Sequence, residues 1–196
     1  MQKDAAWTIS NILAGNQTQI NSIVSSGLVP LLVNALTVGD MRVQKEIAWA
    51  IANFTSNASV QQNLYLVECK IIKPMCDLLV ARDAKLVKVL LDGLCNILLV
   101  AKKVGQLEQA RLYIEEIEGL TKIEKLQEND NEDVYKLAFY LVEQFFSDDN
   151  EGEEIITLHP VTTNEQYMFN GPESTSRSTI STTCSAADST ATKFNF

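Results

Sequence analysis

The most constraining feature of this sequence is a short pattern that occurs twice. Trp7-Thr8-Ile9-Ser10-Asn11 recurs as Trp49-Ala50-Ile51-Ala52-Asn53, so the two tryptophans are 42 residues apart. Residues four apart lie on one face of a helix, so each Trp shares a face with its Asn while the neighbouring aliphatic residues point elsewhere. A period near 40 residues is typical of stacked helical repeats. The pattern therefore predicts a solenoid in which each Trp-x3-Asn helix contributes to one shared surface.

Turn and helix signals divide the chain into units. A helix over residues 2–14 has no N-cap residue before it, so we expect residues 1–14 to be the last helix of a truncated repeat. Three units follow within residues 15–146, each with two short helices and a longer third helix. Gly27 and Gly119 are predicted to occupy the same turn in the first and third units. These signals predict an all-α, right-handed superhelix.

The two faces of the 41–55 helix have different predicted roles. Ile47, Ile51 and Phe54 follow an i, i+4, i+7 stripe, which is typical of a buried face. Trp49 lies roughly 200° around the helix from Ile47 and faces away from that stripe. An isolated Trp is more often a core residue, but a mid-helix Asn beside Trp twice in one register is hard to explain by packing. We therefore predict that Trp7 and Trp49 are exposed.

An acid precedes each Trp by three residues, Asp4 in the first helix and Glu46 in the second. Acid, Trp and Asn then share one side of the helix and suit an extended basic peptide. The Asn amide can bind the peptide backbone, the indole can pack on a Lys or Arg stem, and the carboxylate can meet the charged tip. In the second unit Asn96 keeps the Asn position while Val89 and Asp92 replace the acid and the Trp. The groove is predicted to end near there.

Composition excludes several classes of function. With 16 Lys and Arg against 25 Asp and Glu, the formal charge is -9, which favours cationic partners and argues against nucleic acid. The longest apolar runs are shorter than the roughly 20 residues of a membrane helix, so no membrane partner is expected. No cofactor or metal is predicted, because the four cysteines lack zinc-ligand spacing and are expected to be reduced. The single His159, without a phosphate loop or a nucleophile beside a base, argues against an enzyme.

Residues 147–196 differ in character from the rest of the chain. Five acids and no base occur between residues 147 and 154, and Ser and Thr dominate residues 174–192. Neither stretch has the periodic apolar residues that would offset chain entropy, so we predict an acidic, then Ser/Thr-rich, disordered tail. The acidic run is either a solvated segment or a docking site, and both interpretations stay open.

Several motifs resemble a known family. They are Gly27-Leu28-Val29-Pro30-Leu31-Leu32, Lys45-Glu46-x-Ala48-Trp49, Leu91-Asp92-Gly93-Leu94-x-Asn96-Ile97 and a longer stretch over residues 114–136. Together with the Trp-x3-Asn pairs, they resemble the C-terminal armadillo repeats of the importin alpha (karyopherin alpha) family. The resemblance covers residues 2–154 and implies an armadillo-repeat solenoid. Lys70 stands where this family usually has Gly, and Asp4 where it usually has Glu.

The resemblance implies a nuclear import adaptor of the cytoplasm and nucleus that binds the nuclear localisation signals of cargo proteins. It places the family's minor signal site on Trp7, Ser10, Asn11, Glu46, Trp49 and Asn53, with Asp4 and Asn96 as less certain members. It also implies that the last repeats and the acidic segment bind the recycling export receptor and a nuclear pore basket nucleoporin.

Two expectations concern what this sequence lacks. Importin beta is not expected to bind this chain alone, because the family's basic N-terminal segment is absent from the sequence, as are the earlier repeats. The alternative function is a truncated regulatory protein that sequesters transport factors without carrying cargo. Binding of a basic peptide would separate the two functions.

Overall fold

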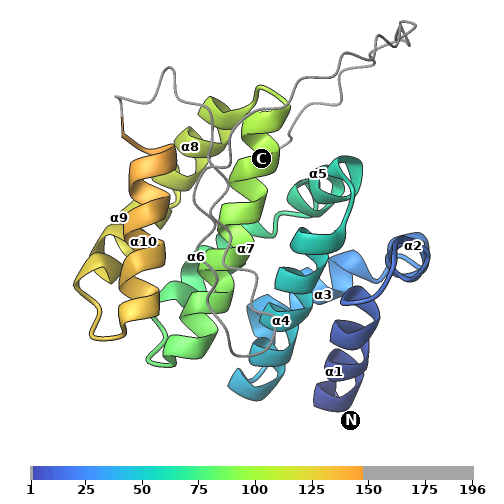
Figure 1. Ribbon diagram of the computed structural model, residues 1–196. Coiled ribbons are helices and arrows are strands. Elements are labelled where there is room, and N and C mark those ends of the chain that lie inside the picture. Colours follow the sequence, from blue (N-terminus) through green and yellow to red (C-terminus); the bar gives the residue numbers. More distant parts are fainter. Residues whose placement is uncertain (1, 148–196) are drawn as a thin grey trace, which may run out of the picture. The chain divides into compact units, whose positions relative to one another are not determined.

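The computed structural model describes residues 2–147, and within them every regular element is helical (Figure 1). The predicted disordered tail lies, from residue 148 onward, outside the described residues. The α-helices are α1 (Gln2–Leu13), α2 (Gln17–Ser25), α3 (Val29–Val38), α4 (Met41–Asn57), α5 (Val60–Glu68), α6 (Ile72–Asp77), α7 (Ala84–Lys103), α8 (Leu107–Glu116), α9 (Gly119–Lys125) and α10 (Glu132–Phe145). Two 3-10 turns, η1 (Leu78–Val80) and η2 (Leu126–Glu128), follow α6 and α9.

The three later long helices begin in the same way. Asp40 precedes α4, Asp83 precedes α7 and Asn131 precedes α10, and each side chain accepts a hydrogen bond from the backbone N–H three residues later, at 3.0, 3.0 and 3.2 Å. Such N-caps satisfy amide groups that have no partner inside the helix. They also give the three helices a common origin, so residues equally far from the cap occupy equivalent positions.

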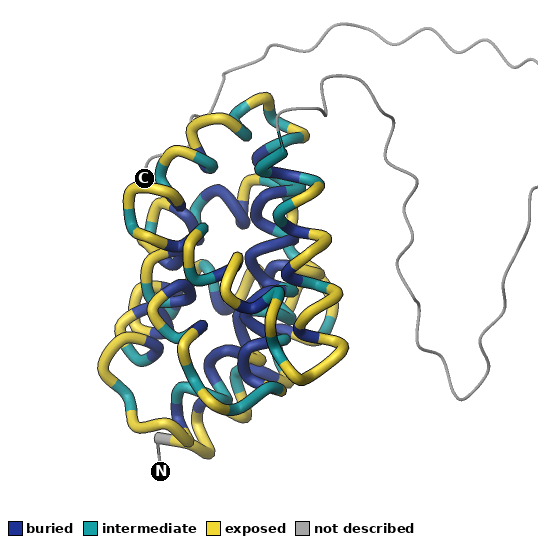
Figure 2. The backbone as a smooth tube through the Cα atoms, turned by 90° about the vertical axis from the view of Figure 1, so that its left-hand side faces the viewer, coloured by how far each residue is buried: buried dark blue, intermediate teal, exposed yellow. Residues whose placement is uncertain are grey.

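The long helices lie next to one another in chain order. Helix α1 packs on α4, α4 on α7, and α7 on α10, while the short helices pack behind them (Figure 1). Buried residues follow the inner sides of the helices and exposed ones the outer sides (Figure 2). Stacking of this kind lets neighbouring helical units share one core.

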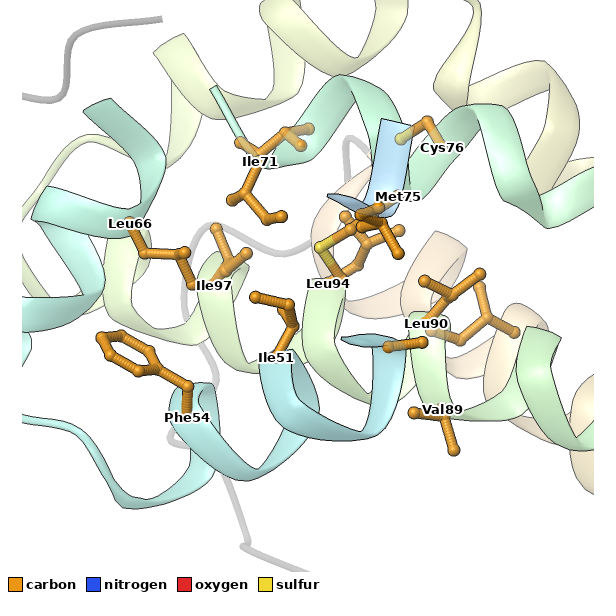
Figure 3. Packing of buried hydrophobic residues seen from close by; sticks show 14 of the residues in the cluster. Ile51, Phe54, Leu66, Ile71, Met75, Cys76, Val89, Leu90, Leu94 and Ile97 are labelled. Carbon is orange, nitrogen blue, oxygen red and sulfur yellow. The ribbon is translucent and has the colours of Figure 1, made fainter. Parts of the chain in front are cut away.

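The core confirms the predicted stripe of α4. Ile47, Ile51 and Phe54 are 2%, 1% and 1% exposed. Figure 3 shows Ile51 and Phe54 among side chains of the following unit, including Leu94 and Ile97 of α7. Full burial of side chains this large contributes about 1.5–3 kcal/mol each, so this shared core is the main force that holds the units together.

The turn between the two short helices corrects one prediction. Gly27, Lys70 and Glu118 have positive φ angles of 70°, 65° and 59° at this point in the three units. Glu118 therefore occupies the place of Gly27, and the assignment of Gly119 was wrong. Gly119 instead begins α9, where a Cβ atom would lie 2.9 Å from the Cys76 sulfur. Close packing of the helix start, rather than a left-handed turn, explains this glycine.

No single helix within residues 2–147 is long and apolar enough to cross a membrane. Helices α2 and α3 meet the length and composition limits only as a pair, which is bent by 78°.

Candidate functional site

Exposed ring and carboxylate side chains form a row across the long helices. Trp7 on α1 is 59% exposed and Trp49 on α4 is 50% exposed, which confirms the prediction that both indoles are open to solvent. Asp92 on α7 is nine residues past its cap, as Trp49 is past its own, and its side chain is 42% exposed. We call this row, with the asparagines one helical turn further on, the ridge. It comprises Trp7, Asn11, Trp49, Asn53, Asp92 and Asn96.

The neighbours of Trp49 explain why its indole is exposed. Ala48 and Ala50 on either side are 1% and 0% exposed, so the helix is enclosed on both flanks as well as along the Ile47 stripe. Only a narrow strip of α4 remains for a large side chain to face solvent. The Trp49 indole on that strip is half covered by the protein and leaves half of its surface open to solvent.

Two asparagines of the ridge, Asn53 and Asn96, connect neighbouring helices. The Asn53 Nδ2 donates to the Ser10 carbonyl at 3.1 Å and to the Ser10 hydroxyl at 3.3 Å. The Asn96 Nδ2 donates in the same way to the hydroxyls of Thr55 at 3.2 Å and Ser56 at 3.1 Å. Each amide therefore clamps its helix to the preceding one. A ligand would meet an Asn53 side chain whose orientation is already fixed.

Two other predicted site residues differ in their surroundings. Ser10 is 7% exposed and lies in the contact between α1 and α4, where it accepts from Asn53. Asn11 is exposed on α1. The structure thus puts Ser10 beneath the ridge as a support and Asn11 on its surface.

Two carboxylates, Asp92 of the ridge and the neighbouring Glu46, form ion pairs with lysines of the same chain. The Glu46 Oε1 is 3.7 Å from the Lys3 Nζ, and the Asp92 Oδ2 is 3.0 Å from the Lys88 Nζ. Asp4 is exposed near the start of α1. The Asp92–Lys88 pair is exposed, and exposed ion pairs contribute about 0–1 kcal/mol, whereas the Glu46 side chain is only 22% exposed.

Sequence reasoning missed one aromatic residue of the row. Tyr140 on α10 is nine residues past its cap Asn131, the same offset as Trp49 and Asp92, and it is 38% exposed. Gln144 takes the position of Asn53 and Asn96. The interval from Asp92 to Tyr140 is 48 residues instead of 42 or 43, which hides the match from a search at fixed period. Counting from the cap residue would have found it.

Two of the three described cysteines are held as neutral thiols in the core. Cys76 and Cys95 are buried, and burial raises the pKa of each thiol to about 12. A thiol must ionise to act as a nucleophile or metal ligand. Within residues 2–147, no group of three or more His, Cys, Asp or Glu side chains is placed to hold a metal ion.

Comparisons with known proteins agree with this architecture. Residues 16–56 match the armadillo/beta-catenin-like repeat, and residues 108–158 match the atypical Arm repeat. Among solved structures, computationally designed armadillo repeat proteins for modular peptide recognition align with a TM-score of 0.64 and 31% identity over 74% of this chain and 58% of theirs. The designed armadillo repeat protein YIII(Dq)4CqI aligns with a TM-score of 0.62 and 30% identity over 72% of this chain and 57% of its own.

Curated relatives extend the match to one family. Importin subunit alpha-4 of Arabidopsis thaliana is 43% identical over 176 residues, which is 87% of this chain and 32% of the relative. Importin subunit alpha-1a of Oryza sativa subsp. japonica is 42% identical over 156 residues, or 77% of this chain and 30% of the relative. The chain thus spans about a third of the length of these relatives. Its armadillo-repeat fold and these similarities show that the chain belongs to the importin alpha family.

Proposed function

We propose that the ridge on α1 and α4 binds an extended peptide rich in Lys and Arg, as the recognition step of a nuclear import adaptor. The observation that carries this proposal is the pair of half-exposed indoles on adjacent helices, each with an acid and an amide on the same side. Membership of the importin alpha family supports a nuclear localisation signal of a cargo protein as the ligand. It also supports a site of action in both cytoplasm and nucleus.

The ridge residues Trp49 and Asn53 and the neighbouring Glu46 have distinct parts in this proposal. The indole of Trp49 packs on the aliphatic stem of a Lys or Arg and attracts its charge through the ring face. The amide of Asn53, held by Ser10, binds the peptide backbone. Glu46 exchanges Lys3 for the cation of the ligand. Adjacent helices are about 8–10 Å apart, so each helix of the ridge corresponds to roughly three residues of extended peptide.

We further propose that the last unit contacts the transport machinery, namely the export receptor and a nuclear pore basket nucleoporin. Tyr135 and Phe139 on α10 support this, because they are 40% and 42% exposed with ring centroids 6.2 Å apart. Large apolar side chains grouped on the surface favour a protein partner.

Peptide titration of the 196-residue chain tests the ridge. A fluorescein-labelled five-residue Lys/Arg peptide is added to the wild type and to Trp49→Ala, and anisotropy reports binding. Loss of the indole is expected to weaken binding by on the order of 1–2 kcal/mol. Glu46→Gln should weaken it mainly at low salt, because exposed charge interactions are screened.

Tyr135→Ala is the matched control, since it removes an exposed aromatic side chain outside the ridge. A peptide with Gln in place of every Lys and Arg should not bind. Equal affinity of wild type and Trp49→Ala for the basic peptide would exclude the ridge as the site. Failure of the wild type to bind any basic peptide would favour the regulatory function without cargo.

A further inference from the structure

We infer that the peptide-binding ridge continues across α7 onto α10, where Asp92 and Tyr140 form a second subsite for a basic side chain. This inference rests on the proposed function and adds to it a longer ligand with a second cationic cluster. The sequence alone predicts that the groove ends near Asn96, so Tyr140 lies beyond that limit.

The register of the helices carries the argument. Trp49, Asp92 and Tyr140 are each nine residues past an N-cap, and Asn53, Asn96 and Gln144 are each thirteen residues past it. The burial pattern agrees with the caps. Residues 43, 47 and 54 of α4 are buried, as are 86, 90 and 97 of α7 and 134, 138 and 145 of α10, which are three, seven and fourteen residues past their caps. Helices α4 and α10 therefore turn the same positions towards the core. Tyr140 on α10 takes the position that Trp49 occupies on α4.

Tyr140 lies on the helix that packs against α7. Helix α10 packs along α7 (Figure 1), and the Tyr140 ring meets Phe145 edge-on with centroids 6.4 Å apart. Phe145 is 2% exposed and fixes one side of the phenol ring. Burial raises the pKa of Tyr140, with a smaller contribution from Cys95 of α7. The phenol therefore stays neutral and presents a ring face at neutral pH.

Asp92 supplies the charge of this subsite. Helix α7 has the carboxylate of Asp92 at the position where α4 has Trp49 and α10 has Tyr140. It packs between these two helices. The Asp92 carboxylate pairs with Lys88 on the same helix, at 3.0 Å, and the side chains of Lys88 and Asp92 are 43% and 42% exposed. A Lys or Arg of a ligand can take the place of Lys88, because such exposed pairs are weak. The ring of Tyr140 then adds a cation–π contact.

The position of the subsite sets the length of the ligand. Trp49 and Tyr140 are two helix intervals apart, or about 16–20 Å. An extended chain covers at most 3.3–3.6 Å per residue, so about five or six residues separate the two contacts. A short basic peptide contacts only Trp7 on α1 and Trp49 on α4, whereas a longer one also reaches Tyr140 on α10.

Two labelled peptides separate these cases in the full chain. One is a five-residue Lys/Arg peptide, and the other carries the same five residues flanked on both sides by six-residue extensions ending in Lys-Arg. A third peptide with Ser-Gly in place of each terminal Lys-Arg controls for length. In the wild type, the cationic extensions should increase affinity over the neutral ones. Tyr140→Ala should reduce that gain by about three- to fivefold, the size of an exposed cation–π contact.

Matched variants decide whether Tyr140 acts through its ring. Tyr140→Phe should keep the gain, and Leu112→Ala, which removes an exposed apolar side chain from α8, should leave it unchanged. Asp92→Asn should reduce the gain most at low salt. The inference would be overturned if the cationic extensions increased the affinity of Tyr140→Ala as much as that of the wild type. It would also be overturned if Tyr140→Ala weakened the binding of the five-residue peptide and of the extended peptide equally. If the wild type binds no basic peptide at all, the proposed function itself fails.

Discussion

Asn53 should hold α1 against α4, and its removal should loosen α1 without unfolding the rest. Asn53→Ala deletes two hydrogen bonds to Ser10, of 3.1 and 3.3 Å, which together contribute about 1–2 kcal/mol. The Ser10 carbonyl keeps its helical bond from Ala14 at 3.0 Å, whereas the buried Ser10 hydroxyl loses the bond that it accepts from Asn53. Alanine also recovers roughly 0.6 kcal/mol of helix propensity. The expected net loss is about 0.5–1.5 kcal/mol.

Hydrogen exchange measures this loss locally. A change of about 1 kcal/mol raises the opening equilibrium of α1 roughly fivefold, so its amides should exchange about five times faster in the variant. Amides of residues 85–98 in α7 should be unaffected, because they lie beyond α4. Asn11→Ala is the control, since it changes an exposed Asn on α1. Unchanged exchange of α1 in Asn53→Ala, or the same acceleration in Asn11→Ala, would refute the clamp.

Three further predictions concern the scaffold. Asp83→Asn keeps an N-cap acceptor and loses only the ion pair with Lys45, so it should lower the free energy of unfolding by less than about 1 kcal/mol. Asp83→Ala also loses the N-cap and should lower it by about 1–2 kcal/mol, which urea denaturation measures. A hydrogen bond from Lys45 lowers the pKa of Asp83, so this pair stabilises the fold above the unfolded pKa near 3.8 and is lost as pH falls through the lower folded value. Wild type and Asp83→Asn should therefore converge in stability in strong acid, and a constant difference would contradict the assignment. Iodoacetamide should leave Cys76 and Cys95 unmodified until the protein unfolds, which peptide mass spectrometry can check. Lys70→Gly should stabilise the chain by roughly 0.5–1 kcal/mol, because it relieves a positive φ of 65°, and a lower melting temperature would contradict this.

The helices and the exposed face of α4 could be predicted because their signals are local. The i, i+4, i+7 stripe of Ile47, Ile51 and Phe54 identifies the core side, and the repeated Trp-Asn spacing identifies the opposite side. Such patterns depend on one helix at a time.

The features that could not be predicted depend on contacts between units. The donation from Asn53 to Ser10 joins residues 43 apart, and no spacing rule names the acceptor. Glu118 was overlooked because an adjacent Gly119 is the residue that usually takes a positive φ, yet Gly119 is needed where α9 approaches Cys76. Tyr140 was missed because the last interval is longer than the others.

The indole N–H signals in a proton–nitrogen NMR spectrum test the central claim most directly. The chain has two tryptophans, and both lie on the ridge, so the indole region contains one signal from each. Titration with a five-residue Lys/Arg peptide should shift both signals along one saturating curve, and Trp49→Ala identifies which is which. A Gln-substituted peptide should move neither. If backbone amides report binding of the basic peptide while both indole signals stay in place, the ridge is not the binding site.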